Sequence, residues 1–369
     1  MNQDFCFDSC RPESDSSLIG WICSYAPEEL ILAAGFVPYR LGPAGAGTGS
    51  DAYLPANICP YVQSLLEVSR TPMKNLRGVV FVDSCDAMRR LGDIWSGYSE
   101  IRVLYRLDCP RRRDEAAENY LIARYRELLA VLEREAGRTV RTDDIRNAAG
   151  TLNETRRLVG RIAALRRTPV SALSGAGFSE IARCAMQSDK MRFNLEAARF
   201  LAARDSRPRD LSSEPRVLLC GCVVHGTELH SLMEDCGIRV AVDDLCTGER
   251  HFNGLVDASL EPLRGIARRY LQRSSCARMQ GAAERVGRLV DLAGECRVDG
   301  IVFLTLKFCD LVQSDLPSLR EAAQHRGIPF LHIERDSLNS AGGQLRTRIQ
   351  AFAEILEQLL MRRGAPSDA

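Results

Sequence analysis

The sequence predicts an α/β fold with two parallel-sheet domains and a helical segment between them. Three observations support this. The chain has 369 residues, which exceeds the ~100–200 residues of one domain. Apolar runs of strand length, such as GVVFV at 78–82, alternate with helix-like segments. Residues 114–204 instead show only helical spacing and no convincing strand.

The first part of the chain alternates between helix and strand, which is typical of a flavodoxin-like or Rossmann-like domain, here over residues 1–112. The loop at 42–55 is rich in glycine and alanine. We expect helices at 27–34, 61–69 and 87–95, and strands at 36–41, 78–82 and 101–107.

A helical segment over 113–208 is expected to pack on this domain as four or five helices, and the polar stretch 205–215 is a plausible boundary. The basic stretch 156–167 has acidic neighbours and no interleaved aromatics, so we interpret it as the solvated face of a helix. A second α/β domain follows over 209–369. Its expected strands are 216–220, 238–242, 300–304 and 329–333, and its expected helices are 228–235, 260–273, 282–293, 316–325 and 344–360.

Composition excludes several classes of protein. Apolar residues make up 45% and charged residues 26% of the chain, which is globular composition. The net charge of +1 gives no reason to expect nucleic-acid binding, and no apolar run reaches the ~18 residues of a membrane span. The N-terminus does not look like a targeting signal, so we expect a cytoplasmic protein. The 46 arginines against 3 lysines are attributed to genome base composition.

The 14 cysteines require an explanation. A long chain without a secretory signal favours reduced thiols over disulfides. Helix N-termini beside Cys23, Cys59 and Cys85 are expected to lower their thiol pKa values. Cys184 and Cys296 fall inside helices and are discounted. Six cysteines follow expected strands or precede expected helices: Cys23, Cys59, Cys85, Cys222, Cys246 and Cys309.

Ligands of open α/β sheets bind outside the carboxyl ends of the strands, where several of these cysteines fall. No pair has C-x-x-C spacing, which argues against a zinc ribbon or a thioredoxin-like dithiol. Dispersed thiolates can still converge on one iron–sulfur cluster. Each cysteine taken alone is more simply a small buried hydrophobe, and only their collective placement favours a cluster.

Six sequence blocks together resemble the 2-hydroxyacyl-CoA dehydratase and benzoyl-CoA reductase family, whose members include the D-component of 2-hydroxyglutaryl-CoA dehydratase. The blocks occur in the family's order and cover nearly the whole chain. They are GWICSYAPEELILAAGFVPYRL, NICPYVQSLLE, GVVFVDSCDAMRRLGDIW, VAVDDLCTGERHF, DGIVFLTLKFCD and GQLRTRIQAFAEIL.

The resemblance implies two flavodoxin-like domains with a [4Fe-4S] cluster between them, held by cysteines that match Cys59, Cys85 and Cys309. It also implies a lyase that acts on an acyl-CoA thioester, and pairing of subunits into a homodimer or with a paralogous sister chain. A separate ATP-hydrolysing iron–sulfur activator would deliver one electron, so that a ketyl radical of the thioester can lose the 2-hydroxyl. The chain has neither a Walker A motif nor a G-x-G-x-x-G after its first strand, so it is not its own ATPase and not evidently a dinucleotide enzyme.

Additional cysteines leave a second possibility open. One branch of the family, the double-cubane cluster proteins, resembles this chain in carrying more cysteines and reduces small molecules as an oxidoreductase at an [8Fe-9S] cluster. The cysteines that would serve a second cubane here are Cys23, Cys222, Cys246 and Cys276. Two further alternatives are a non-catalytic partner subunit and a metal-free binding protein.

Charged residues near the expected site are weaker candidates. Glu28 and Glu29 are candidate proton-handling carboxylates, or else first-turn glutamates that complement a helix dipole. Lys307 precedes Cys309 by two residues and either contacts substrate or extends into solvent at a strand end. His225 and His230 are by default ordinary surface or core histidines.

Overall fold

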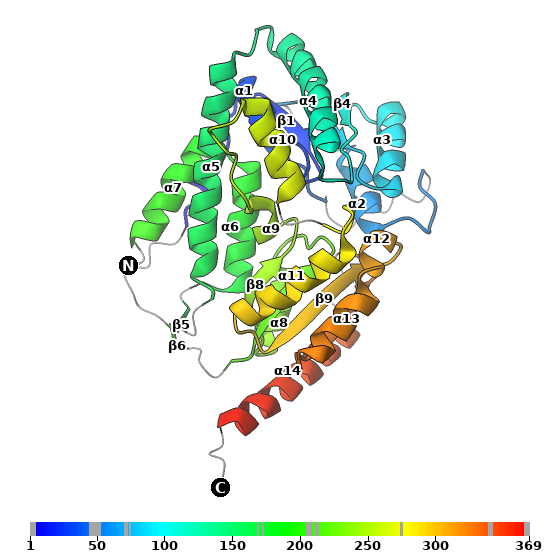
Figure 1. Ribbon diagram of the computed structural model, residues 1–369, viewed down its shortest axis with the longest axis vertical. Coiled ribbons are helices and arrows are strands. Elements are labelled where there is room, and N and C mark those ends of the chain that lie inside the picture. Colours follow the sequence, from blue (N-terminus) through cyan, green and yellow to red (C-terminus); the bar gives the residue numbers. More distant parts are fainter. Residues whose placement is uncertain are drawn as a thin grey trace.

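The computed structural model describes residues 5–43, 53–69, 73, 75–167, 170–171, 173–203, 209–210, 214–273, 276–338 and 342–364. Most of the predicted loop at 42–55 and of the predicted boundary at 205–215 lies outside these residues. Two four-stranded parallel sheets form the centre of the molecule, each flanked by helices (Figure 1). The predicted fold class is confirmed. The predicted domain limits of 1–112, 113–208 and 209–369 stay predictions.

The first sheet has the strand order β2-β1-β3-β4. Its strands are β1 (Leu18–Trp21), β2 (Val37–Arg40), β3 (Leu76–Val82) and β4 (Val103–Leu107). Helices α1 (Glu28–Ala33), α2 (Pro60–Val68) and α3 (Asp86–Tyr98) connect or follow them. The central strand β1 was not predicted, because four residues of LIGW beside a polar N-terminal stretch give little periodicity.

The second sheet has the order β10-β9-β7-β8. Its strands are β7 (Arg216–Gly221), β8 (Arg239–Asp244), β9 (Gly300–Leu306) and β10 (Phe330–Arg335). If each sheet's strands are numbered from its own first strand, both sheets read 2-1-3-4. The two halves therefore share a topology, and each has a switch point between its first and third strands.

Among its described residues, the predicted helical segment contains four helices: α4 (Glu115–Ala136), α5 (Thr142–Ala164), α6 (Gly175–Gln187) and α7 (Lys190–Ala203). The Asp114 side chain caps α4 by accepting a hydrogen bond from the Ala117 backbone N–H, and Ser174 caps α6 in the same way through Gly177. A two-residue ladder between β5 (Val170–Ser171) and β6 (Arg209–Asp210) is a strand pairing in this region that the sequence did not predict.

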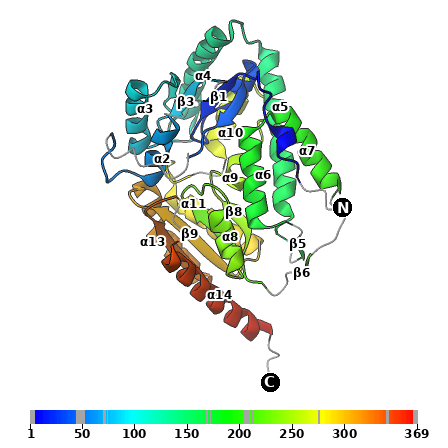
Figure 2. The same ribbon diagram turned by 180° about the vertical axis from the view of Figure 1, so that it is seen from behind.

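Part of the second half packs into the first. Helix α10 (Pro262–Gln272) packs on α4 and α5, and α9 (Glu249–Phe252) packs on α5 (Figure 1; Figure 2 gives the view from behind). Side chains of both also bind the glutamates of α1. Phe252, Ile266 and Tyr270 belong to the same hydrophobic core as Trp21 and Leu121. The chain thus returns to the first core after leaving it, and short α9 was not predicted.

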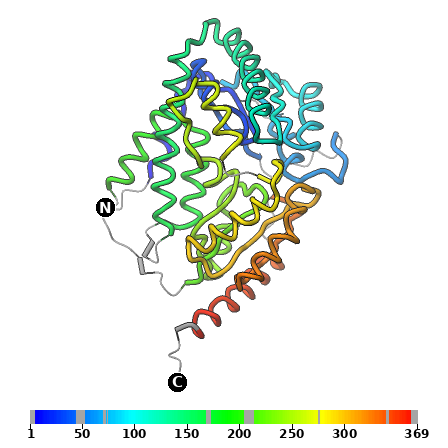
Figure 3. The backbone as a smooth tube through the Cα atoms, in the orientation of Figure 1, coloured from blue at the N-terminus to red at the C-terminus, as the bar shows by residue number. Residues whose placement is uncertain are grey.

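The short 3-10 helix η1 (Asp8–Cys10) lies at the N-terminal side and packs on α7. The remaining helices belong to the second half: α8 (Glu228–Asp235), α11 (Ala282–Glu295), α12 (Asp310–Gln313), α13 (Leu316–His325) and α14 (Gly343–Gly364). The tube view shows α14 running along and beyond one end of the molecule (Figure 3). In the part of the chain that the structure describes, no helix combines the length and apolarity needed to span a membrane.

Gly221 ends β7 in a conformation that favours glycine, with φ at +115°. A Cβ atom there would lie 2.1 Å from the Leu304 carbonyl oxygen of the neighbouring strand. We therefore expect Gly221→Ala to lower the unfolding free energy by at least ~2 kcal/mol, from backbone strain and separation of β7 from β9. Chemical denaturation would measure the change.

Gly160 provides the matched control. It lies within α5, and a Cβ there would meet no atom within 4 Å. Gly160→Ala should raise the unfolding free energy by ~0.5–1 kcal/mol, because alanine restricts the unfolded chain more than glycine does. Equal effects of the two substitutions would contradict this account of Gly221.

Candidate functional site

Cysteines gather where the carboxyl ends of the two sheets approach each other. Cys23 and Cys85 follow β1 and β3, the two strands at the first switch point. Cys222 and Cys309 follow β7 and β9, the corresponding strands of the second sheet. Open α/β sheets bind their ligands at such points, so the topology places four thiols where a ligand would be expected.

One hydrophobic cluster of residues spans both halves of the molecule at this place. It contains Cys59 and Cys222, and Cys85, Cys246 and Cys309 pack against it. The cluster draws side chains from strands of both sheets, including Phe81 of β3 and Leu306 of β9. Five of the cysteines singled out from the sequence therefore share one apolar environment.

Three of these thiols are in direct contact. The Cys309 sulfur accepts hydrogen bonds from the thiols of Cys222 and Cys59, and these contacts hold the pKa of Cys309 well below its ordinary value. The same contacts, together with burial, raise the pKa of Cys59 and of Cys222. Cys222 also accepts a hydrogen bond from the Leu306 backbone N–H at 3.3 Å, which fixes it beside β9.

Cys85 begins α3 and interacts electrostatically with Cys309 and Cys276. Burial raises the pKa of Cys85 and of Cys23, and this effect outweighs the lowering by backbone N–H groups at the helix starts. The expectation of lowered thiol pKa values at Cys23, Cys59 and Cys85 was therefore wrong. The helix N-termini are present, but desolvation and the Cys59–Cys309 contact dominate.

Cys59, Cys85, Cys222 and Cys309 form the first group of cysteines, and a second group, Cys23, Cys246 and Cys276, lies next to it. The Cys23 thiol interacts with Cys276 and Cys246. Burial alone would raise the pKa of Cys246, but the guanidinium groups of Arg40 and Arg250 lower it overall. Arg40 donates to the Cys246 backbone carbonyl at 2.5 Å and lies 3.6 Å from its sulfur.

Two residues that sequence reasoning left without a role belong to this region. Arg40 is the last residue of β2 and is buried. A charged residue at the end of a buried strand could have indicated a functional role, but the arginines were attributed to genome composition. Cys109 is buried and interacts with Cys23 and Arg278. Cys184 and Cys296 lie outside both cysteine groups, although Cys184 contacts the thiol of Cys10. Cys184 is inside α6 as expected, whereas Cys296 directly follows the last residue of α11.

The donor chemistry of the site is that of soft thiolates. Within the described ranges, no three His, Cys, Asp or Glu side chains are arranged to chelate a single metal ion. An iron–sulfur cluster differs in that each cysteine binds a separate iron atom, and its usual protein ligands are thiolates. The cysteines gathered here from several strand ends, in an apolar surrounding, therefore have the chemistry needed to hold an iron–sulfur cluster.

Glu28 and Glu29 lie in a buried network of charges and contact no cysteine among the residues described. Glu28 binds the Lys190 ammonium at 2.9 Å and the His251 Nε2 at 2.9 Å. Burial opposes ionisation of Glu28, but Lys190 and His251 outweigh it, so the pKa is lowered. The ring of His251 stacks on Trp21 with centroids 5.2 Å apart.

Glu29 has a separate set of partners. Its carboxylate binds the Arg156 guanidinium and accepts a hydrogen bond from the Tyr270 hydroxyl at 3.0 Å. Burial raises its pKa, and Arg156 more than reverses the effect. A catalytic role for either glutamate stays a prediction. The interpretation of residues 156–167 as a solvated face was wrong for Arg156 and Arg166, because both are buried in ion pairs.

The other sequence candidates are spread out. Lys307 is exposed at the end of β9. His230 is buried in α8, and burial lowers its pKa to about 4. His225 is half-buried and faces a pocket beside Arg40.

Comparison with known proteins matches residues 23–356 to the family model described as 2-hydroxyglutaryl-CoA dehydratase, D-component. The chain belongs to this family. Three relatives align over most of both chains. This chain is 25% identical to the (R)-phenyllactyl-CoA dehydratase beta subunit of Clostridium sporogenes, and the alignment covers 93% of each chain. It is 26% identical to the lactoyl-CoA dehydratase subunit beta of Anaerotignum propionicum, covering 95% of this chain and 94% of the relative.

The third relative is named as a reductase. Identity to a benzoyl-CoA reductase subunit of Thauera aromatica is 24%, covering 97% of this chain and 96% of the relative. The expected family is thereby confirmed. So is the expected enzyme class of that family, whose named members are dehydratases, which are lyases, and a reductase, which is an oxidoreductase. All three relatives are named as subunits.

The Glu28 network predicts a pH dependence of stability. Burial lowers the pKa of His251 from 6.5 to about 3. Between these values the unfolded chain binds a proton that the folded chain does not bind, so stability falls as the pH falls through this window. We expect His251 to account for a loss of about 2 kcal/mol in unfolding free energy between pH 7.5 and pH 5.

Denaturant titrations of the wild type and of His251→Gln at both pH values would measure this contribution. The loss on acidification should be smaller by that amount in the variant. His325→Gln, at the exposed C-terminal end of α13, serves as the control and should retain the full loss. An unchanged pH dependence in His251→Gln would contradict the assignment.

Proposed function

We propose that this chain is the iron–sulfur subunit of a 2-hydroxyacyl-CoA dehydratase-like enzyme, with a [4Fe-4S] cluster held by Cys59, Cys85 and Cys309. The observation that supports it most is the convergence of these thiols from both halves onto one buried place. When bound, such a cluster supplies one-electron chemistry and an open iron site for a thioester substrate.

The chain's own residues would provide the surroundings for that chemistry. Ile22, Leu306 and Phe81 are fully or almost fully buried in the shared apolar cluster and shield the inner side of the thiol group from water, while Cys85 and Cys309 stay partly exposed. A dry surrounding strengthens electrostatic contacts and protects reactive intermediates. Glu28 and Glu29 remain the candidate proton-handling carboxylates, and the buried Lys190 and His251 are the groups that could exchange a proton with Glu28.

Partners are part of the proposal. The electron would come from a separate ATP-hydrolysing iron–sulfur activator, the substrate would be an acyl-CoA, and the chain would pair with a copy of itself or with a paralogous sister subunit. The beta-subunit names of two relatives favour a sister subunit. They also keep open a supporting, non-catalytic role for this chain.

A second candidate is a double-cubane [8Fe-9S] reductase of small molecules. The observation that favours it is the second group, Cys23, Cys246 and Cys276, beside the first. Arg40 and Arg250 place positive charge next to Cys246, which would balance additional thiolates. In that arrangement Cys222 belongs to the first group, where its thiol contacts Cys309.

Iron and sulfide per chain, counted after anaerobic purification and reconstitution, distinguish the two candidates. About four irons per chain favour a single cubane, and about eight favour two. A chain that holds no iron under these conditions would contradict both.

Single substitutions test the ligands. Cys309→Ala should abolish iron binding, because it removes the thiol at the centre of the first group. Cys296→Ala is the matched control: it removes a thiol at the C-terminal end of α11, outside both groups, and should leave the iron content unchanged. Cys276→Ala should halve the iron only if a second cubane is present. Full iron in Cys309→Ala would refute the assignment.

A further inference from the structure

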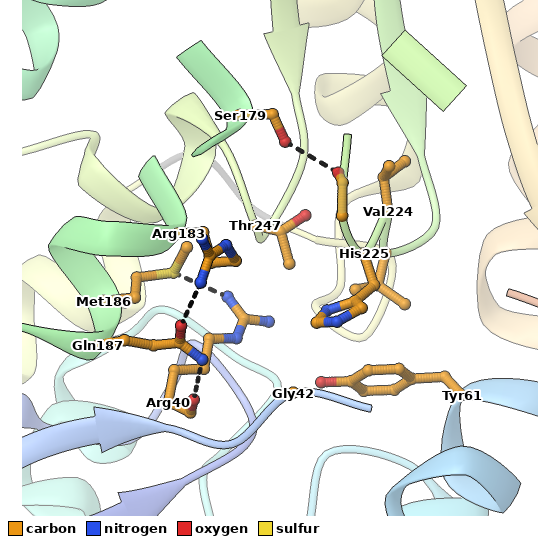
Figure 4. A pocket seen from close by; sticks show the side chains of 12 residues that line it. Arg40, Gly42, Tyr61, Ser179, Arg183, Met186, Gln187, Val224, His225 and Thr247 are labelled. Atoms are coloured by element: carbon orange, nitrogen blue, oxygen red, sulfur yellow. Dashed lines mark hydrogen bonds between the residues drawn. The ribbon is translucent and has the colours of Figure 1, made fainter. Parts of the chain in front are cut away.

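A pocket lies beside the cysteine groups, between β2, α2, α6 and the loops that follow β7 and β8 (Figure 4). Its cavity volume is about 30 Å³, and about 400 Å³ is reached only when all the empty space up to open solvent is counted. Val223 and Thr247 of its lining directly follow Cys222 and Cys246 in the chain. The pocket therefore lies next to the second group of cysteines, which Arg40 touches at Cys246, and receives walls from both halves of the molecule.

The lining carries positive charge and hydrogen-bond donors but no carboxylate. Arg40 and Arg183 contribute guanidinium groups, and Tyr61, His225 and Ser179 contribute polar side chains. Figure 4 shows the guanidinium groups of Arg40 and Arg183, the Tyr61 hydroxyl and the His225 ring directed toward the same space. Neither Asp nor Glu lines the pocket among the residues that the structure describes.

Arg40 is the buried member of this set, with 5% of its surface exposed. Its guanidinium contacts the Cys246 carbonyl and sulfur, the Met186 sulfur at 3.1 Å and the Tyr61 side chain. Among the described residues, Arg40 forms no ion pair with a carboxylate. The ionisable groups in contact with Arg40 are the Cys246 thiol and the Tyr61 hydroxyl, so no carboxylate among the described residues occupies the guanidinium that lines the pocket.

Arg183 supplies a second, more accessible guanidinium. It donates to the Gln187 side-chain oxygen at 2.9 Å, and its contact to Glu180 is long, 3.5 Å, and half exposed. An exposed pair of this kind is weak, so the guanidinium remains available to a ligand. Burial, Arg40 and Arg183 together lower the pKa of His225, which makes it a neutral hydrogen-bond partner.

We propose that this pocket binds an oxyanion carried by the substrate, a carboxylate or a phosphate group, between Arg40 and Arg183. Planar guanidinium groups recognise both kinds of oxyanion through paired, charge-assisted hydrogen bonds. The proposal rests on the proposed function insofar as the oxyanion belongs to an acyl-CoA. There it comes either from a carboxylate at the far end of the acyl chain or from the phosphates of coenzyme A.

Binding calorimetry on the full chain under anoxia tests this with glutaryl-CoA and valeryl-CoA, whose five-carbon acyl chains differ at the terminal carboxylate. If the pocket receives the chain carboxylate, glutaryl-CoA binds roughly tenfold more tightly, and Arg183→Gln removes the advantage. Arg183→Lys should retain part of it. Arg126→Gln, an exposed substitution on α4 outside the pocket lining, is the control and should retain all of it.

A third ligand, valeryl-pantetheine, identifies a phosphate as the source. If Arg183→Gln weakens valeryl-CoA roughly tenfold but leaves valeryl-pantetheine unchanged, the pocket receives a phosphate of coenzyme A. Gly42→Ala gives a variant that keeps both charges. Its Cβ would lie 2.6 Å from the His225 ring, so it should narrow the pocket and weaken the same ligands. Equal affinities in wild type and Arg183→Gln for all three ligands would overturn the proposal.

Failure of the proposed function gives a different result. If the wild type binds none of the thioesters, the acyl-CoA assignment fails, and titration with glutarate and with inorganic phosphate decides the pocket separately. Binding of either anion that Arg183→Gln weakens supports an oxyanion site. Binding that is absent, or equal in the variant, overturns it.

Discussion

Two adjacent buried carboxylates on a six-residue helix join elements of the two halves of this molecule. Glu28 of α1 binds Lys190 of α7 and His251 of α9, while Glu29 binds Arg156 of α5 and Tyr270 of α10. Breaking a buried pair by removing one partner typically costs ~3–5 kcal/mol, because the other charge is left unpaired. The position of α9 and α10, which follow β8 in the chain, depends on these contacts.

The same network reaches the cysteine region through an aromatic stack. His251 lies on Trp21, and the Arg40 guanidinium lies over the same indole, 5.2 Å from its centroid. Arg40 in turn touches Cys246 and faces the cationic pocket. A continuous series of buried contacts therefore links the core carboxylates to the proposed cluster and substrate sites. Charge in one of these places is felt electrostatically in the others, because the surrounding dielectric is low.

The sequence was sufficient for the elements with strong periodicity. Buried parallel strands such as β3 and β9 and helices such as α13 follow from apolar runs and helical spacing. The four-residue elements β1, α9 and α12 did not, because so few residues carry little periodicity, although the equally short β2 was predicted. Positions after strands or before helices were enough to single out most of the cysteines that converge. They could not show that Cys276 lies with them, since this residue follows no strand. Burial also reversed the expected thiol pKa values, which only the three-dimensional packing determines.

The return of α9 and α10 to the first core means that the two halves are not separable along the chain. A fragment that stops before β7 would lack Phe252, Ile266 and Tyr270 and would expose the apolar surface that they cover. A fragment that starts at β7 would carry these helices without a core to receive them. During synthesis the first core is therefore complete only after α10, more than forty residues beyond the start of β7, has been made.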